Sequence, residues 1–197
     1  MNKRNTNVTD TKERIIEAAD DLFYENGYEF TSFKDIADEV KLSRGNFYHH
    51  FKTKDDILKA VIVRRIAKTK DMLTSWEEET KSPKGRIRCF IKILIANQAK
   101  IKLYGCPVGT LTTELSKLDH SSKEDATKIF TMFHKWLSKQ FRELGLIKEA
   151  DSLAMHLLAL SQGVATMATA FPSEIYIKQE VKQMLEWLDA KLAKKEM

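Results

Sequence analysis

The chain has 197 residues with a formal net charge of +5; 43% of the residues are hydrophobic and 31% are charged. This is the composition of a globular protein with a sizeable core, and only seven glycines and three prolines interrupt its helix-forming stretches. Cys89 and Cys106 are too few for a disulfide framework, and the polar start MNKRNTNVTDTKE lacks the apolar run of a signal peptide, so we expect a cytoplasmic protein.

Basic residues are concentrated locally rather than over the whole chain. Residues 1–60 hold ten Lys or Arg against twelve Asp or Glu, whereas residues 40–54 hold four basic residues and no acidic one. Because no global positive field exists in this part of the chain, any nucleic-acid surface is expected to be confined to that segment.

The first fifty residues carry the pattern of three helices. Apolar residues recur on one helical face from Thr11 to Phe23, and Gly27 is a natural stop. A short helix is expected over residues 33–40, and after a two-residue turn a third helix begins at the cap Ser43. Two short helices joined by a tight turn form a helix-turn-helix.

The third helix is expected to have an apolar face and a polar face. Phe47 and Phe51 fall on the inward side, where they can pack on Leu22, Phe23, Ile36 and Val40. The side chains left to face outward are those of Arg44, Gly45, Asn46, Tyr48 and His49. The adjacent His49 and His50 point about 100° apart on a helix, so we expect no metal site there.

The remaining residues also read as helices. A continuous helix is expected from Lys54 to about Leu73, and another from Pro83 to the break at residues 104–107. Further helices are expected over residues 108–118, 123–144, 149–171 and 174–194. The uncharged stretch 152–173 is long enough for a membrane span, but its polar residues favour a soluble helix buried on two sides. We expect the last two helices to pair with a second copy as a four-helix dimer interface.

The run TSFKDIADEVKLSRGNFYHHFKTKDDIL, with Tyr48, Phe51 and Lys54 at its end, resembles the DNA-binding region of TetR-type transcriptional regulators. The resemblance covers roughly residues 11–62, and Lys41 stands where the family often has glycine in the turn. It implies an all-α fold, with a helix-turn-helix DNA-binding domain over residues 1–53. Residues 54–197 would be a helical effector-binding and dimerisation domain.

The resemblance also implies a homodimeric regulator, most often a repressor, that binds a palindromic operator in double-stranded DNA and responds to a small molecule. Arg44 can reach a guanine edge, Asn46 an adenine edge or a phosphate, and Gly45 lets the helix approach the duplex closely. Phosphate contacts are expected from the remaining residues of this surface, namely Thr31, Ser32, Ser43, Tyr48, His49 and Lys54.

A ligand cavity is the second site that the resemblance implies. The residues expected to line it are Phe90, Leu94, Gln98, Leu111, Met132, Phe133, Trp136 and Gln162. Each of these positions is also compatible with a packed core. The effector itself is not indicated.

Cys106 supports an alternative mode of regulation. The stretch YGCPVGTLTTEL resembles a segment of family members that include a branch sensing electrophiles through cysteine. A cysteine at a helix N-terminus is favoured as thiolate, so Cys106 is either a redox or electrophile sensor or a plain packed residue.

Two other classes of protein were weighed against a regulator. An enzyme is not expected, since no phosphate loop, nucleophile elbow, metal-spaced His or Cys set or pair of catalytic carboxylates stands out. No cofactor, metal or membrane partner is therefore expected. A helical interaction module without DNA binding would explain the apolar stripe of the last helix, but not the acid-free segment at 40–54.

Overall fold

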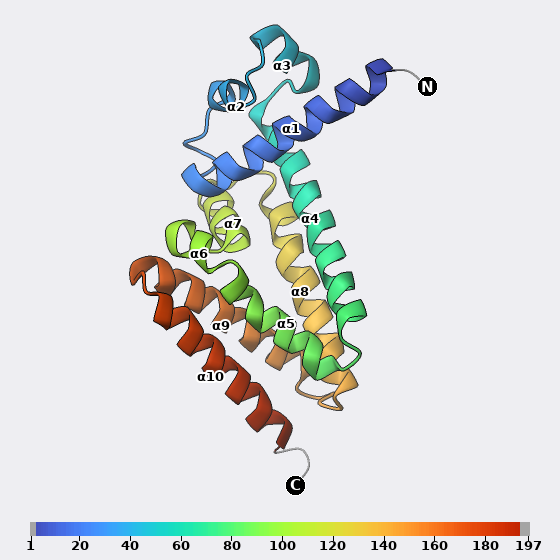
Figure 1. Cartoon of the computed structure of the whole chain (residues 1–197), viewed down its shortest axis with the longest axis vertical. Helices are drawn as coiled ribbons and strands as arrows, with labels where there is room; N and C mark the ends of the chain where they lie inside the picture. The colour runs from blue at the N-terminus through green and yellow to red at the C-terminus, as the bar shows by residue number, and fades with distance from the viewer. Residues whose placement is uncertain (1–2, 194–197) are drawn as a thin grey trace. The chain divides into compact units, whose positions relative to one another are not determined.

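The computed structural model describes residues 3–193, without the side chains of residues 3–9, Arg44 and Glu174. Within this range the chain forms ten α-helices and no strand, so the predicted all-α class is confirmed (Figure 1). The helices are α1 (Lys3–Asn26), α2 (Phe33–Glu39), α3 (Arg44–His50), α4 (Lys54–Glu79), α5 (Pro83–Ala96), α6 (Gln98–Tyr104), α7 (Pro107–Lys117), α8 (Lys123–Glu143), α9 (Ala150–Ala170) and α10 (Glu174–Ala193).

The helices group into two compact units. Unit 1 comprises residues 1–67 and 110–126, and unit 2 comprises residues 68–109 and 127–197. The sequence-based boundary between residues 53 and 54 falls inside unit 1, because the first part of α4 shares a core with α1–α3. Residues 110–126 belong to the same unit and add Leu111 and Leu115 to that core.

Unit 1 is built around the rings of α3. Phe47 is fully buried and Phe51 is 5% exposed, and both belong to one apolar cluster with Phe23, Ile36 and Val40. The inward packing predicted for the two rings is therefore confirmed. Burying a phenylalanine side chain stabilises a fold by roughly 1.5–3 kcal/mol, so these rings hold the short helix α3 in place.

Local signals end and begin the helices of unit 1. Gly27 follows α1 at φ +88°, a left-handed conformation that glycine adopts at little cost. Ser32 begins α2 with a capping box, in which its hydroxyl accepts from the N–H of Asp35 and its own N–H donates to that carboxylate. Lys41 lies in the turn between α2 and α3 at φ +55°, a left-handed conformation at the position where the family often has glycine.

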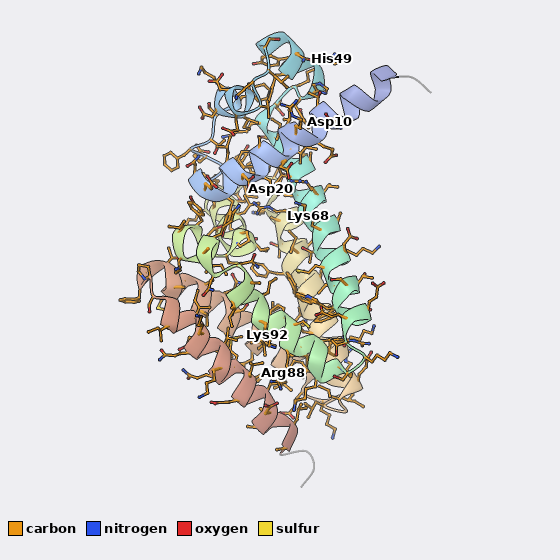
Figure 2. All side chains as sticks on the ribbon, in the orientation of Figure 1. Asp10, Asp20, His49, Lys68, Arg88 and Lys92 are labelled. Atoms are coloured by element: carbon orange, nitrogen blue, oxygen red, sulfur yellow. The ribbon has the colours of Figure 1, made fainter. Side chains whose placement is uncertain are left out.

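An ion-pair network joins α1 to α4 within unit 1. Arg65 is buried, and its Nε donates to Asp20 Oδ1 at 2.6 Å. Arg64 on the same helix contacts Glu17 at 2.8 Å and Asp20 at 3.6 Å (Figure 2 labels Asp20 on α1). The paired carboxylate compensates the cost of burying the Arg65 guanidinium.

Unit 2 packs α5 and α6 against the pair α9 and α10. Figure 1 shows α9 and α10 running antiparallel, and α5 contacts both of them. Phe90 of α5 meets Phe133 of α8 edge-to-face, with ring centroids 5.5 Å apart. Trp76, in the part of α4 that belongs to unit 2, lies 5.6 Å from the ring of Trp136. Aromatic contacts therefore tie α8 to its neighbours.

Three helix boundaries differ from the sequence-based expectation, and one of them is the end of α4, which continues from the expected Leu73 to Glu79. The first helix begins at Lys3 rather than near Thr11, so the polar residues before Thr11 lie inside the helix. The helix expected from Pro83 to the break at 104–107 is two helices, since α5 ends at Ala96. Asn97 follows it, and its side-chain Nδ2 donates to the carbonyl of Ile93, a local bond that competes with helix continuation.

By length and composition α9 could cross a membrane, since an 18-residue window within it has a mean hydropathy of 1.3. Core helices of soluble proteins meet the same criteria. The residues of α9 that are buried within the protein are Ala150, Leu153, Ala154, Leu157, Leu158, Ser161, Val164, Ala165 and Ala168. Their spacing of three and four residues places them on one face of the helix, so α9 is buried on one side within this chain and not on the two sides expected from the sequence.

Candidate nucleic-acid interface and ligand cavity

The start of α3 presents backbone and small polar side chains to solvent. Ser43 caps the helix, and its Oγ accepts from the N–H of Asn46 at 3.4 Å. Gly45 and Asn46 are exposed, and a Cβ added to Gly45 would meet no described atom within 4 Å. The side chain of Arg44 lies outside the described residues. This end of α3 is therefore open to a close approach by another molecule.

The outer face of α3 is supported by the rings beneath it. Phe33 packs edge-to-face on Phe47 at 4.6 Å and also lies 4.9 Å from the ring of Tyr48. Tyr48 is 48% exposed while its ring lies against that of Phe33. His49 is exposed on the same helix (Figure 2). The structure thus brings Gly45, Asn46, Tyr48 and His49 together on one short helix.

Three predicted phosphate contacts have structural roles of their own. Ser32 is exposed at the start of α2, where its hydroxyl serves as the cap. Thr31 is 1% exposed, and its hydroxyl donates to the carbonyls of Gly27 and Leu22. Lys54 donates to the carbonyl of Tyr28 at 2.9 Å, and its ammonium lies 4.2 Å from the Tyr28 ring centroid. Thr31 and Lys54 therefore brace the turn between α1 and α2.

The same turn is held by residues far away in the sequence. The Glu114 carboxylate of α7 accepts from the backbone N–H groups of Tyr28 at 2.9 Å and Glu29 at 2.8 Å. Tyr28 donates its hydroxyl proton to Asp55, whose carboxylate lies 3.7 Å from His120 Nε2. The α1–α2 turn, the start of α4 and the α7–α8 connection are thereby joined within unit 1. Only the folded chain brings Glu114 and His120 to this place.

Charge and burial shift the ionisation of this cluster. The hydrogen bond from Tyr28 is the main reason that the pKa of Asp55 lies below its ordinary value, and His120 adds to the effect. Burial and the Asp55 carboxylate raise the pKa of Tyr28 well above its ordinary range. Both shifts favour a neutral phenol donating to an ionised carboxylate at neutral pH.

The Tyr28–Asp55 bond predicts a specific acid sensitivity. Because the pKa of Asp55 is lower in the folded than in the unfolded protein, its contribution is present above the unfolded pKa, near about 4, and is lost as pH falls through the folded value. The Tyr28→Phe variant should therefore unfold at lower urea than the parent at pH 7, with the difference shrinking below about pH 4. Urea titrations followed by circular dichroism would measure it, and a difference independent of pH would contradict the bond.

Removal of the Glu114 carboxylate should weaken unit 1. The Glu114→Ala variant is expected to lose about 1–3 kcal/mol of unfolding free energy, because two backbone N–H groups lose a charged acceptor. Glu114→Gln should lose less, since an amide oxygen can still accept one bond. Glu13→Ala, at an exposed position of α1, is the matched control and should change stability by at most about 0.5 kcal/mol. Equal stabilities of the Glu114 and Glu13 variants would contradict this role.

A cavity of about 90 Å³ lies within unit 2. Four of the residues predicted to line a ligand site line this cavity, namely Phe90, Leu94, Phe133 and Gln162. The other lining residues are Ile93, Asn97, Ile101, Cys106, Pro107, Val108, Phe130, Leu158, Ser161 and Ala165. Helical periodicity could have identified part of this set. Residues 90, 93 and 94 share one face of α5, and residues 158, 161, 162 and 165 share one face of α9.

The other four predicted lining residues lie elsewhere. Leu111 belongs to the core of unit 1, and Trp136 donates its indole N–H to Glu77 at 3.0 Å. Met132 is half-buried on α8 and does not line the cavity. Gln98 is at the start of α6 with its buried Oε1 unpaired among the described residues. The apolar pattern of the sequence therefore does not distinguish residues of the packed core from residues that line the cavity.

Cys106 sits at the entry to α7 and lines the cavity. Its Sγ accepts from the N–H of Gly109 and from Gln162 Nε2, both at 3.4 Å. A Cβ on Gly109 would lie 2.3 Å from Gln162 Oε1, so a larger residue at this position would displace the amide of Gln162. Gln162 thus connects the first turn of α7 to the cavity wall.

A second, more open groove of about 410 Å³ lies along α8 and α9. Phe130, Leu158 and Gln162 line both this groove and the cavity. Large apolar side chains are also exposed on and between the last two helices, at Met155, Met167, Phe171 and Ile175. Within the described residues, no group of three or more His, Cys, Asp or Glu side chains that could hold a metal ion occurs.

Comparison with known proteins identifies relatives of the helix-turn-helix region and of most of the chain. Residues 15–61 match the sequence model of bacterial regulatory proteins of the tetR family. An uncharacterized HTH-type transcriptional regulator in the lacX 3' region of Lactococcus lactis subsp. lactis is 32% identical over 161 residues, which are 80% of this chain and 82% of that protein. The HTH-type transcriptional repressor DhaR of Mycobacterium sp. (strain GP1) is 25% identical over 162 residues, 79% of this chain and 80% of that protein.

A solved structure supports the same assignment over nearly the whole chain. The TetR transcriptional regulator from Legionella pneumophila has a TM-score of 0.79 and 25% identity, over 91% of this chain and 96% of that one. Regulators of this family are soluble and are not enzymes. The exposed face of α3 on its buried rings, the helical unit that follows and these similarities show that the chain belongs to the TetR family of DNA-binding transcriptional regulators.

Proposed function

We propose that this regulator is a cytoplasmic repressor that binds a palindromic operator as a homodimer and is released by a small-molecule effector. In this proposal residues 1–53 contact the DNA, and residues 54–197 bind the effector and form the dimer. One observation carries the DNA-binding part: α3 buries Phe47 completely while Gly45, Asn46 and His49 on the same helix are exposed.

The proposed contacts divide into base readers and phosphate binders. Arg44 and Asn46 are near the start of α3 beside the exposed Gly45, where side chains can reach base edges in the major groove. Ser32, Ser43, Tyr48 and His49 would contact phosphates and position the domain on the DNA backbone. Thr31 and Lys54 would act indirectly, by holding the turn before α2 in place.

The proposed dimer uses α9 and α10. Met155, Met167, Phe171 and Ile175 are between 42% and 67% exposed, which is unusual for large apolar side chains that have no partner. Ala159 and Gly163 are exposed on α9, and a Cβ on Gly163 would meet no described atom within 4 Å, so another helix could approach closely there. A four-helix interface with a second copy would cover these groups.

The proposed release requires a route from the cavity to the DNA-binding helices. α4 and α7 each run from one unit into the other. Pro107 and Val108 at the start of α7 line the cavity, and Glu114 near its end holds the turn before α2. An effector that favours a different position of these helices would shift the population away from the DNA-binding spacing. The two recognition helices must be about 34–36 Å apart to enter successive major grooves.

Selection of bound sequences from random duplexes, with the full-length protein, tests this function directly. The expected product is an inverted repeat whose half-sites are separated by about one helical turn. Sedimentation of the complex should show one dimer, or an even number of protomers, on each duplex. A selected site without symmetry, or no enrichment at low salt, would overturn the proposal.

Cys106 supports a second candidate, release by an electrophile. Its sulfur lines the cavity and is contacted by the N–H of Gly109 and the amide of Gln162. With N-ethylmaleimide, the thiol would add across the activated double bond. The S–C bond forms as the C=C π bond breaks, and the thiol proton ends on the neighbouring carbon. The adduct would fill the cavity as an effector does.

Alkylation of two variants gives a prediction for this candidate. N-ethylmaleimide should lower operator affinity of the parent and of Cys89→Ser, but should leave Cys106→Ser bound. Burial raises the pKa of the Cys89 thiol, so that residue should react slowly at neutral pH. Binding measured by fluorescence anisotropy, with mass spectrometry to count adducts, would check it. Equal release of the parent and Cys106→Ser would remove the candidate.

A further inference from the structure

The lining of the cavity in unit 2 restricts the chemistry of the effector. The described residues that line it include no Asp, Glu, Lys, Arg or His. The charged residues of α5 that Figure 2 labels lie outside the lining: Arg88 is 3.7 Å from Asp189, and Lys92 is exposed. An ion placed in the cavity would lose its hydration and find no opposite charge, at a cost of several kcal/mol.

The apolar part of the wall fits a compact, flat or rounded molecule. Phe90, Phe130 and Phe133 contribute rings, and Leu94 and Ile101 add aliphatic surface. The cavity volume is about 90 Å³, and an apolar cavity of about 150 Å³ holds benzene. A single ring therefore requires the cavity to enlarge by roughly two thirds. The groove beyond Phe130, Leu158 and Gln162 has the space that such a movement needs.

One polar group of the wall can exchange its partners for a ligand. Gln162 Nε2 donates to Cys106 Sγ and to Ser161 Oγ, both at 3.4 Å. A thioether or thiol sulfur is a weak acceptor, and 3.4 Å is long for a bond from an amide to a hydroxyl oxygen. A ligand oxygen at normal hydrogen-bond distance would be a better acceptor for this amide. Among the other polar side chains that line the same space, Asn97 already donates to the carbonyl of Ile93 and Ser161 to the carbonyl of Leu158.

We infer that the effector is an uncharged, compact and largely apolar molecule, of about one ring, with an oxygen atom that accepts from Gln162. This inference rests on the proposed effector function, because it specifies the ligand of the same cavity. It excludes organic cations and carboxylates as inducers that bind there. It also predicts that Gln162 determines the preference for an oxygen-bearing ligand over a hydrocarbon of equal size.

Four molecules of matched size test the inference on the full-length protein. They are benzyl alcohol, toluene, benzoate and benzylamine, which is protonated at neutral pH. Calorimetric titration should give the tightest binding for benzyl alcohol. Both ions should bind at least about tenfold more weakly, because neither finds a counter-charge. In Gln162→Leu, benzyl alcohol should lose its advantage over toluene. Ala165→Leu narrows the cavity and should weaken both neutral ligands, with circular dichroism to verify folding.

The outcomes separate the ligand class from the effector role. Ions that bind as tightly as benzyl alcohol, or no binding by either neutral probe up to its solubility, would overturn the inference. An unchanged preference in Gln162→Leu would overturn the role of that amide. Operator binding to the selected duplex is then measured with each ligand. If benzyl alcohol fills the cavity without weakening operator binding, the proposed release fails while the ligand class stands. Release of the operator by benzoate alone would overturn the ligand class, while the proposed release by an effector would stand.

Discussion

Replacing Phe47 by alanine is expected to lower the unfolding free energy by about 3–5 kcal/mol and to abolish specific DNA binding. The ring is fully buried in the core of unit 1 and packs edge-to-face on Phe33. Its removal leaves a cavity under a helix of only seven residues, which has little stability of its own. Urea unfolding followed by circular dichroism and anisotropy titration of a labelled operator would measure both effects.

An exposed phenylalanine of the same unit is the matched control. Phe30 lies in the turn between α1 and α2 and is 85% exposed, so Phe30→Ala should change stability by at most about 0.5 kcal/mol. Comparing the two variants shows whether the loss of stability comes from removing a buried ring or from removing any phenylalanine ring. An unfolding midpoint of Phe47→Ala equal to that of Phe30→Ala would show that α3 is not held by this packing.

Replacing Gly45 by leucine is expected to separate stability from DNA binding. Within the described residues no atom lies within 4 Å of an added Cβ, so the fold should accept the side chain. A non-glycine residue in a helix should raise stability by about 0.5–1 kcal/mol. The same side chain would project from the exposed start of α3 and hold the helix away from the duplex. Operator affinity should fall about ten- to a hundredfold, the equivalent of one or two lost base contacts.

Gly45→Ala is the control for this effect. It gives nearly the same gain in helix propensity but adds only a methyl group, so its loss of operator affinity should be smaller than that of leucine. Thermal unfolding and operator titration at one fixed salt concentration would compare the variants. Equal operator affinities of Gly45→Leu and the parent would show that the start of α3 does not approach the DNA closely.

The elements that could be predicted from the sequence are those set by local interactions. The caps Ser32, Ser43 and Ser82 all accept a hydrogen bond from the backbone of the helix that follows them. Gly27 and Gly105 adopt positive φ where the sequence indicated breaks. Burial of Phe47 and Phe51 follows from helical periodicity. Each of these signals acts over a few residues, so it is readable without the fold.

The exposure of the candidate DNA-binding face was predictable to a similar extent, with Thr31 as an exception. Gly45, Asn46, Tyr48 and His49 are exposed on α3, as their positions on the helix indicate. Thr31 was grouped with them because hydroxyls often contact phosphates, but its side chain is buried against the carbonyl of Gly27. A residue just after a helix end can turn in or out, and the sequence pattern does not distinguish the two.

Tertiary structure decided which distant residues meet. Glu114 contacts the N–H groups of residues 28 and 29 only because α7 and the turn before α2 pack into one unit. The cavity likewise takes its walls from α5, α6, α7, α8 and α9, and Trp136 and Leu111 pack elsewhere. The sequence by itself determined the helices, their caps and the inward rings of α3, since backbone hydrogen bonds and periodicity are short-range. Contacts between helices depend on how all the apolar faces are buried together, and this is settled only when the whole chain folds.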